Sequence, residues 1–203
     1  ERGFVEIPEG GKPYVFMDDF RANPIAHPIQ TASGKIELFC QTIADYQLED
    51  FAGHPEWREP QEWLGAPLSE DFPLHMISIQ PSDRLHSQMD ATATVQANKT
   101  AGRETLYMHP QDAEARQIVD GDEIEVSNAR GRMLAGVRLT DGLTPGVVII
   151  ATGAWFDPGF GRAWQPWDRA GNPNVLTLDI GTSSLTQGPN AMSCLVEIKK
   201  HLM

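Results

Sequence analysis

Residues 109–131 read HPQDAEARQIVDGDEIEVSNARG, and this stretch decides the fold. Pro110 suits the first turn of a helix, where a missing backbone N–H leaves no hydrogen bond unmade, so we predict a short helix that stops near Gln117. The pair Asp120-Gly121 predicts a turn. Residues 123–127 then alternate polar and apolar side chains, which indicates a half-buried strand. The stretch therefore predicts a short helix followed by a strand.

Short apolar runs flank this stretch on both sides. Each is short enough for a strand and too short for a typical helix: Leu74–Ile79, Thr105–Met108, Arg132–Leu139 and Val147–Ile150. Gly136 indicates a bulge within its run. The last run is wholly apolar, which predicts a strand covered on both faces. Short strands joined by tight turns predict a compact β-barrel, because closure removes exposed sheet edges. The topology stays open at this level of reasoning.

The first 70 residues are expected to be an irregular lead-in. Prolines interrupt every periodic pattern early, at positions 8, 13, 24, 28, 55, 60 and 67. Within it we predict a short strand at 36–39 and a short helix at 43–51, and we expect Trp57 and Trp63 to pin the segment to the main body. The predicted domains are residues 1–70, which belong with an upstream part of the protein, and residues 71–203, the barrel.

Charge and composition exclude several classes of partner. The 203 residues carry a formal net charge of −12 and no run of Lys and Arg, which argues against binding to polymeric nucleic acid. Backbone N–H groups and neutral side chains can still hold one small phosphate ligand. No apolar stretch reaches about 20 residues, so no membrane insertion is predicted. The chain starts at Glu1 without a signal peptide, and we expect it to be a fragment of a longer polypeptide.

Cysteine usage offers no metal site. Cys40 and Cys194 are the two cysteines, and neither belongs to a cluster with metal-ligand spacing. We expect two buried thiols, and a disulfide between them is the alternative.

The run at 109–131 resembles the signature of molybdopterin-dinucleotide-binding domains. Those domains share Pro-x-Asp-Ala, an Arg, Asp-Gly-Asp and Arg-Gly in this order. The resemblance implies a mostly β fold, a six-stranded double-psi β-barrel with short helices, bound to molybdopterin guanine dinucleotide. We interpret the charged residues of the signature as structural, with Arg116 paired to a nearby carboxylate; they are Asp112, Arg116, Asp120 and Asp122.

Further segments resemble the S- and N-oxide reductases of the dimethyl sulfoxide reductase superfamily. Residues 78–88 read SIQPSDRLHSQ and contain the Arg-Leu-His-Ser-Gln motif of those enzymes. Similar matches are GAWFD at 153–157, GNPNVLT at 171–177, GTS at 181–183, QGP at 187–189, LVE at 195–197 and SGKIE at 33–37. The resemblance covers nearly the whole chain. It is closest to the biotin sulfoxide, trimethylamine N-oxide and dimethyl sulfoxide reductases.

This resemblance implies a set of cofactor-binding residues: Ser78, Gln80, Pro81, Arg84, His86, Ser87, Gln88 and Asn174. Their chemistry suits the role. Hydroxyls and amides can read a guanine edge or a phosphate oxygen without adding charge, and an Arg can fork onto a phosphate. The alternative is a polar turn with a capped His. We expect Ser78, Gln80, His86, Ser87 and Asn174 to converge on one concave face.

Asn174 has an alternative role, and one further family contact lies outside this set. Asn174 could instead be a turn residue bonded to its own backbone, and Asn172 is then the fallback. A further family contact falls near Met192, whose side chain cannot make that hydrogen bond, so Asn190 or Ser193 is the substitute. Trp155, Trp164 and Trp167 could line a substrate funnel, and we favour packing for all three.

The activity that the resemblance implies belongs to a larger protein. The cofactor would be molybdenum bis(molybdopterin guanine dinucleotide), completed by missing upstream domains, which would also supply a Ser ligand to the metal. No catalytic or metal-binding residue is assigned here, and the fragment alone is expected to be inactive. The expected partners are the remainder of the polypeptide, a small S- or N-oxide, and an electron-donor protein or reduced nicotinamide. The expected setting is a soluble bacterial protein, cytoplasmic or periplasmic.

A second class of function is a non-catalytic double-psi barrel module that binds protein partners, because fold alone does not settle function. The discriminating feature is whether the segment 84–88 and Asn174 share one cleft. A binding module has no need of that arrangement.

Overall fold

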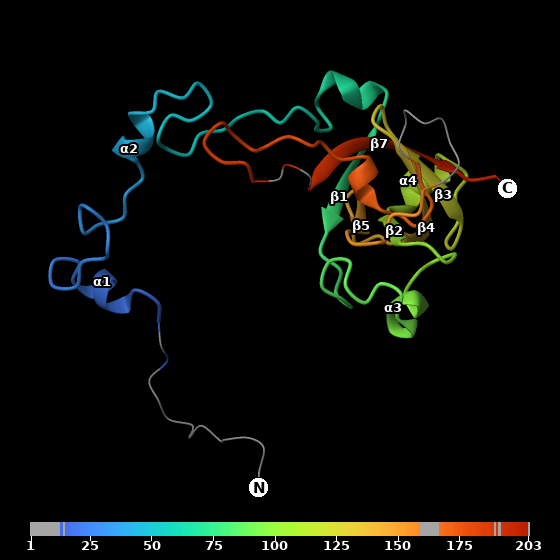
Figure 1. The fold of residues 1–203 in the computed structure, drawn as a ribbon, viewed down its shortest axis with the longest axis horizontal. Helices are drawn as coiled ribbons and strands as arrows, with labels where there is room; N and C mark the ends of the chain where they lie inside the picture. The colour runs from blue at the N-terminus through green and yellow to red at the C-terminus, as the bar shows by residue number, and fades with distance from the viewer. Residues whose placement is uncertain (1–12, 14, 159–166, 189, 191, 203) are drawn as a thin grey trace, which may run out of the picture. The chain divides into compact units, whose positions relative to one another are not determined.

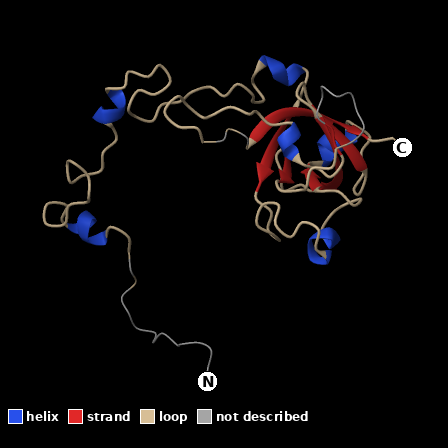
Figure 2. Ribbon diagram, in the orientation of Figure 1, coloured by secondary structure: helices blue, strands red, loops and turns tan. Residues whose placement is uncertain are grey.

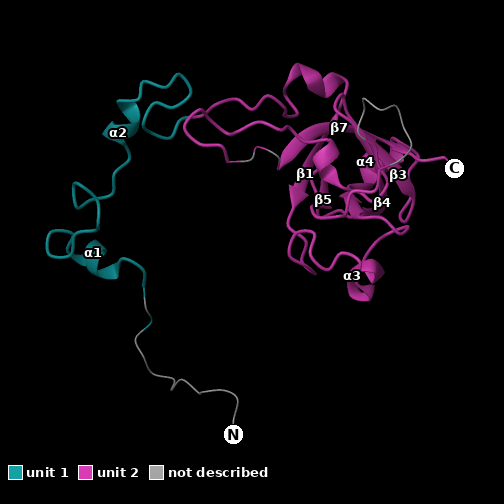
Figure 3. Ribbon diagram, in the orientation of Figure 1, with its two compact units in different colours: residues 1–56 teal, residues 57–203 magenta. Residues whose placement is uncertain are grey.

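The computed structural model describes residues 13, 15–158, 167–188, 190 and 192–202 (Figure 1). The chain divides into two compact units, residues 1–56 and 57–203 (Figure 3). Each is described by itself. No helix in the described part of the chain is both long and apolar enough to cross a membrane.

The second unit is built on a closed barrel. Its strands are β1 (Leu74–Ile79), β2 (Thr105–Met108), β3 (Glu123–Ser127), β4 (Arg132–Leu139), β5 (Val147–Ala151) and β7 (Ser193–Lys200). They pair in the order β2-β5-β1-β7-β3-β4, and β4 pairs with β2 to close the ring. The pairs β1–β5 and β2–β4 are parallel, and the other pairs within the ring are antiparallel. The short β6 (Trp167–Asp168) adds to β4 outside the ring.

Short helices surround the barrel (Figure 2). They are α3 (Ala93–Ala97), α4 (Pro110–Glu114) and the single 3-10 turns η1 (Pro67–Glu70) and η2 (Pro173–Val175). Helix α4 begins at Pro110, as predicted, and the imidazole of His109 caps it by accepting a hydrogen bond from the backbone N–H of Gln111. The expected mostly β fold with a closed six-stranded barrel is confirmed.

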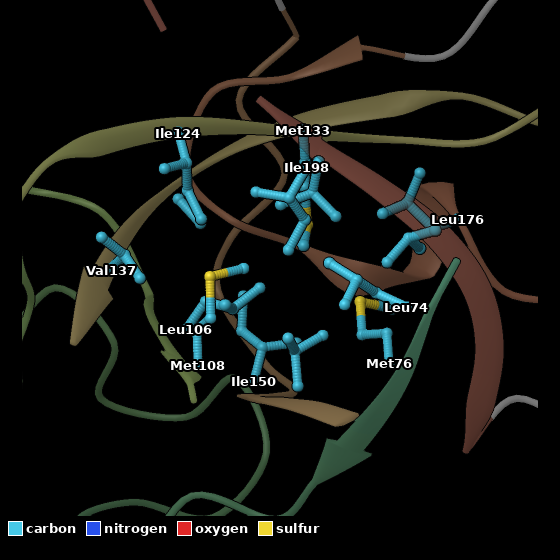
Figure 4. Close-up of a cluster of buried hydrophobic side chains, with 14 of the residues drawn as sticks. Leu74, Met76, Leu106, Met108, Ile124, Met133, Val137, Ile150, Leu176 and Ile198 are labelled. Atoms are coloured by element: carbon cyan, nitrogen blue, oxygen red, sulfur yellow. The ribbon is translucent and has the colours of Figure 1, made fainter. Parts of the chain in front are cut away.

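The core is the interior of this barrel (Figure 4). Alternate residues of every long strand point inward, as the period of two in a strand requires. The buried side chains include Leu74, Met76, Leu106, Met108, Ile124, Met133, Ile150 and Ile198, all 0–1% exposed. Leu176, just after η2, also packs against this cluster, which anchors the segment that carries Asn174.

Two strand predictions need correction. The prediction that residues 147–150 are covered on both faces is wrong: Val148 and Ile150 are buried, whereas Val147 and Ile149 are partly exposed. A barrel strand has one inner and one outer face. Because the outer-face residues here are apolar too, the sequence does not show which residues face outward.

The prediction of a bulge at Gly136 is also wrong, because Gly136 continues both ladders of β4 without a break. A Cβ atom there would lie 2.1 Å from the carbonyl oxygen of Thr100, so close backbone approach is the reason for glycine.

The lead-in differs from expectation in several places. Residues 36–39 form no strand, and the predicted helix at 43–51 is instead α2 (Gln41–Ala44), which follows α1 (Asp18–Ala22). Residues 36–39 have no partner strand among the described residues, so they form no ladder. Both cysteines are free; Cys194 is buried as expected, whereas Cys40 is exposed. Burial raises the pKa of the Cys194 thiol to about 12, which keeps it protonated.

The segment 57–70 is held to the barrel by a carboxylate. Trp57 is 83% exposed, so the expectation that it pins this segment is wrong. The buried Glu62 accepts two hydrogen bonds from Arg130, at 2.5 and 3.0 Å, and a third from the backbone N–H of Leu195 at 2.8 Å. Such a bidentate pair fixes both distance and orientation.

Candidate functional site

One end of the barrel carries a polar cleft of about 510 Å³. Because β1 and β5 are parallel neighbours, the loops that follow them leave the barrel at the same end. The loop after β1 contributes His86 and Ser87, and the loop after β5 contributes residues 152–156. The third wall comes from Asn172 and Asn174, at the start of η2.

The two loops are locked together by close contacts. Gly153 has φ +97°, and a Cβ atom on it would lie 2.1 Å from the carbonyl oxygen of His86. The indole N–H of Trp155 donates to the carbonyl oxygen of Ser87 at 2.7 Å. Arg84 donates to the carbonyl oxygens of His86 and Thr152, at 3.1 and 3.2 Å. Contacts within the protein therefore hold the two loops of the cleft in place.

The wall with the two asparagines depends on Asp168. This carboxylate is wholly buried. It accepts hydrogen bonds from the backbone N–H groups of Ala170, Gly171 and Asn172 at 2.7–2.9 Å, and of Asp157 at 2.8 Å. Asn172 then caps η2 by accepting from the backbone N–H of Asn174 at 3.0 Å. The backbone-bonded turn residue is thus Asn172, and the exposed Asn174 side chain faces the cleft.

The structure brings together part of the predicted site. His86, Ser87 and Asn174 line one cleft. Gln80, Pro81 and Arg84 line a neighbouring hollow of about 450 Å³. Gln88 is exposed and lines neither. The remaining residue, Ser78, lies within β1, is 4% exposed, and donates its backbone N–H to the carbonyl oxygen of Met192.

Arg84 is engaged by the protein. Its side chain is 2% exposed, and all three guanidinium nitrogens donate to protein acceptors. Besides the two carbonyl oxygens above, these are the carboxylates of Asp83 and Glu104. The Arg84 guanidinium is therefore already bonded to protein groups, whereas an arginine available to a phosphate would have free N–H donors.

The tryptophans divide between two roles. Trp155 is 61% exposed and lines the cleft, so the packing interpretation is wrong for it. Trp167 is partly buried with the guanidinium of Arg132 at 4.4 Å from its ring centroid, a packed cation–π pair that confirms the interpretation there. Trp164 lies outside the described residues.

Several cleft residues were not predicted. Gly153, Ala154 and Phe156 belong to a segment that resembles the family but were given no binding role, and Thr152 directly precedes that segment. The usable signal was Gly153, since a glycine within two residues of the end of a strand can mark a close approach. Asp168 was also missed. An Asp followed within two to four residues by small and polar residues often accepts hydrogen bonds from the backbone N–H groups of the turn that follows it.

The signature residues are structural, as predicted. Arg116 donates to the carboxylate of Glu197 at 2.9 Å. Asp112 accepts from the backbone N–H of Gly146, Asp120 from that of Leu139, and Asp122 from that of Val119, each at 2.8 Å. None of the four signature side chains lines the cleft.

A closed barrel with a preformed polar cleft at one end defines a ligand-binding β-barrel domain. Residues 74–195, more than half of the chain, match the family model of the molydopterin dinucleotide binding domain. The chain belongs to this family, and the resemblance drawn from the sequence is confirmed.

Curated relatives of the chain are longer proteins. The chain is 45% identical over 200 residues to trimethylamine-N-oxide reductase 1 of Escherichia coli K12, covering 97% of the chain and 24% of the relative. It is 45% identical over 188 residues to biotin sulfoxide reductase of Cereibacter sphaeroides (93% and 25%). It is 40% identical over 200 residues to dimethyl sulfoxide/trimethylamine N-oxide reductase of Rhodobacter capsulatus (98% and 24%). The chain thus spans about a quarter of their length.

A solved structure supports the fold. Acetylene hydratase from Pelobacter acetylenicus superposes with a TM-score of 0.65 at 17% identity, covering 88% of this chain and 25% of that one. At this identity the likeness concerns the fold alone.

Proposed function

We propose that this chain is the cofactor-binding portion of a molybdenum oxidoreductase that reduces an S-oxide or N-oxide. The observation that carries the proposal is the convergence of His86, Ser87 and Asn174, from distant parts of the sequence, on one cleft of a barrel in the dinucleotide-binding family. The relatives are named for reductions of trimethylamine N-oxide, dimethyl sulfoxide and biotin sulfoxide. We propose the same class of substrate here.

The cleft suits one molybdopterin guanine dinucleotide. The protein carries a net charge of −12, so a pyrophosphate must be held by neutral groups in a preformed concavity. The amides of Asn172 and Asn174, the Ser87 hydroxyl and the His86 imidazole supply such groups. Trp155 offers an exposed aromatic face beside them. We propose Gln80 and Pro81, in the neighbouring hollow, as further contacts of the same ligand.

The residues of the chain bind and orient the cofactor. When bound, the molybdenum of a bis(molybdopterin guanine dinucleotide) supplies the oxygen-atom transfer chemistry, and the protein orients and shields it. Exposed donors on Asn174 and His86 would fix the position of the dinucleotide, while Trp155 and Phe156 would exclude water from one side. We propose that other parts of a longer polypeptide complete the cofactor site and hold the metal.

The proposed partners follow from this role. They are the remainder of the polypeptide, to which residues 1–70 would belong, a small oxide substrate, and an electron-donor protein or reduced nicotinamide. A non-catalytic barrel that binds proteins is the competing hypothesis. The cleft shared by His86, Ser87 and Asn174 supports the cofactor hypothesis, because a protein-binding barrel needs no such convergence.

The test uses the full-length protein. His86→Ala and Asn174→Ala should each lower the content of bound guanine dinucleotide, since a lost hydrogen bond to a charged group costs roughly 1.5–3 kcal/mol of binding. His27→Ala is the matched control, because His27 is exposed and lies in the first unit. Dinucleotide content is measured by chromatography after release, alongside the rate of oxide reduction. Full occupancy in both variants would contradict the proposal.

A further inference from the structure

Five charged side chains gather beside the cleft, and together they are called the charged frame: Asp83, Arg84, Asp90, Lys99 and Glu104. The side chains of Arg84, Lys99, Asp90 and Glu104 are only 2–9% exposed, and that of Asp83 is 18% exposed. They come from the loop after β1, the segment after α3 and the residue before β2. Burying charges is costly unless they pair, so the pairing inside this group matters.

Pairing in the charged frame is dense. Nζ of Lys99 lies 2.8 Å from Oδ1 of Asp90 and 3.7 Å from Oε2 of Glu104. Arg84 reaches Glu104 at 2.8 Å, Asp83 at 3.1 Å and Asp90 at 3.6 Å. Burial raises the pKa of the Glu104 carboxyl, and the charges of Arg84 and Lys99 oppose that rise. Two cations thus neutralise most of three carboxylates.

The charged frame is also bonded to the backbone of both cleft loops. Arg84 donates to the carbonyl oxygens of His86 and Thr152. The second carboxylate oxygen of Asp90 accepts from the backbone N–H of Trp155 at 3.3 Å. The loop between these contacts holds His86 at φ +50° and Met89 at φ +63°, a region that side-chain-bearing residues rarely adopt. Such a conformation persists where the surroundings over-determine it.

We infer that the charged frame, none of whose side chains lines the cleft of His86, Ser87 and Asn174, positions that cleft through its loops. Lys99 is then a positioning residue for His86, Ser87 and Trp155. This inference deepens the proposed function and rests on it. Arg84 then acts as a bridge between two loops, since its nitrogens already serve four acceptors within the protein. Lys99 acts one step further away, by holding Asp90 where it meets both Arg84 and Trp155.

Two substitutions test the charged frame. Lys99→Met keeps the apolar stem of the side chain and removes the charge, which leaves the buried Asp90 with Arg84 at 3.6 Å as its nearest cation. Arg84→Lys keeps a positive charge and loses the fork that reaches His86, Thr152 and Glu104 together. Lys99→Arg keeps the positive charge and is the conservative variant, so it should behave like the wild-type protein. Lys199→Met, on the exposed end of β7, is the matched control.

The first readout is release of the dinucleotide from the full-length holoprotein. We expect Lys99→Met and Arg84→Lys to release it roughly tenfold to a hundredfold faster, by analogy with the loss of affinity when an outer-shell partner of a metal ligand is removed. Lys99→Arg and Lys199→Met should release it near the wild-type rate. Wild-type release from both Lys99→Met and Arg84→Lys would overturn the inference.

The second readout is hydrogen exchange of the full-length apoprotein, which needs no cofactor. In both variants exchange should rise at amides 84–90 and 152–155 and stay unchanged in β3 and β4. An equal rise throughout the barrel would show general destabilisation, and unchanged exchange in the loops would show a direct ligand role; either overturns the inference. If Lys99→Met does not fold, Arg84→Lys decides by the same readouts. A wild-type protein without dinucleotide would instead refute the proposed function.

Discussion

The indole N–H of Trp155 donates a hydrogen bond to the carbonyl oxygen of Ser87 at 2.7 Å, and so joins the loop after β5 to the loop after β1. The Trp155 ring remains 61% exposed despite this bond. An exposed indole held by its nitrogen presents a fixed aromatic face, because the side chain cannot rotate without losing the bond. The residue therefore combines a tether between loops with a rigid surface in the cleft.

Trp155→Phe should weaken dinucleotide binding while keeping an aromatic face. The lost neutral hydrogen bond is worth about 1 kcal/mol, or roughly a fivefold change in affinity. The measurement is the dinucleotide content of the full-length protein during stepwise dilution. Trp57→Phe is the control, because Trp57 is 83% exposed and does not line the cleft. A variant at position 155 that retains the dinucleotide like the control would refute the tether.

Gly153→Ala should destabilise the domain more than an ordinary glycine substitution. Its φ of +97° penalises any side chain, and the added Cβ would also overlap the His86 carbonyl. We expect a loss of roughly 2–5 kcal/mol in the free energy of unfolding. Gly121→Ala is a matched control, since Gly121 has φ +89° with open space around it, and it should cost about 1 kcal/mol. Urea unfolding of the 203-residue chain measures both, and equal losses would refute the close approach.

Asp168→Asn should loosen the third wall of the cleft. The amide keeps the shape of the carboxylate. Its NH₂ group, however, cannot accept the backbone N–H hydrogen bonds that a carboxylate oxygen accepts in the wild-type protein. We expect destabilisation of about 3 kcal/mol or more. Asp141→Asn, in an exposed turn, should stay within about 0.5 kcal/mol of wild type. The midpoint of urea unfolding reports the difference, and similar midpoints for the two variants would contradict the role of Asp168.

His75 should make stability depend on pH. Burial lowers the pKa of its imidazole below the usual 6.5, and Glu62 opposes this less strongly. The unfolded chain therefore gains a proton that the folded chain resists. This contribution to stability is fully present above pH 6.5 and is lost as the pH falls through the folded pKa.

The variant His75→Gln isolates this effect. The free energy of unfolding is measured by urea at about pH 8 and about pH 5, and the drop between them should be smaller than in wild type. His27→Gln, an exposed histidine of the first unit, should leave the drop unchanged. An equal drop in wild type and His75→Gln would exclude the burial effect.

Local patterns predicted the strands and the family. Residues 105–108, 123–127 and 132–139 form strands with the predicted bounds, because alternation and turn residues are encoded within a few neighbouring positions. The signature at 109–131 likewise depends on local spacing. Arg116 pairs with a carboxylate as predicted, and the family model confirms the resemblance. The backbone N–H groups that bond to Asp112, Asp120 and Asp122 were not predicted.

The resemblance predicted one concave face for five residues, and only the tertiary structure decided that His86, Ser87 and Asn174 share the cleft while Ser78 and Gln80 do not line it. Pairing of β1 with β5 brings His86 beside Gly153, and the turn around Asp168 carries Asn174 to them, although no spacing in the chain encodes either approach. It also decided the state of Arg84, since an arginine in a motif looks the same whether it is free or buried among carboxylates. Burial, ion pairing and side-chain exposure depend on contacts between residues that are distant in the sequence. Local sequence patterns do not show these contacts, which form only when the chain folds.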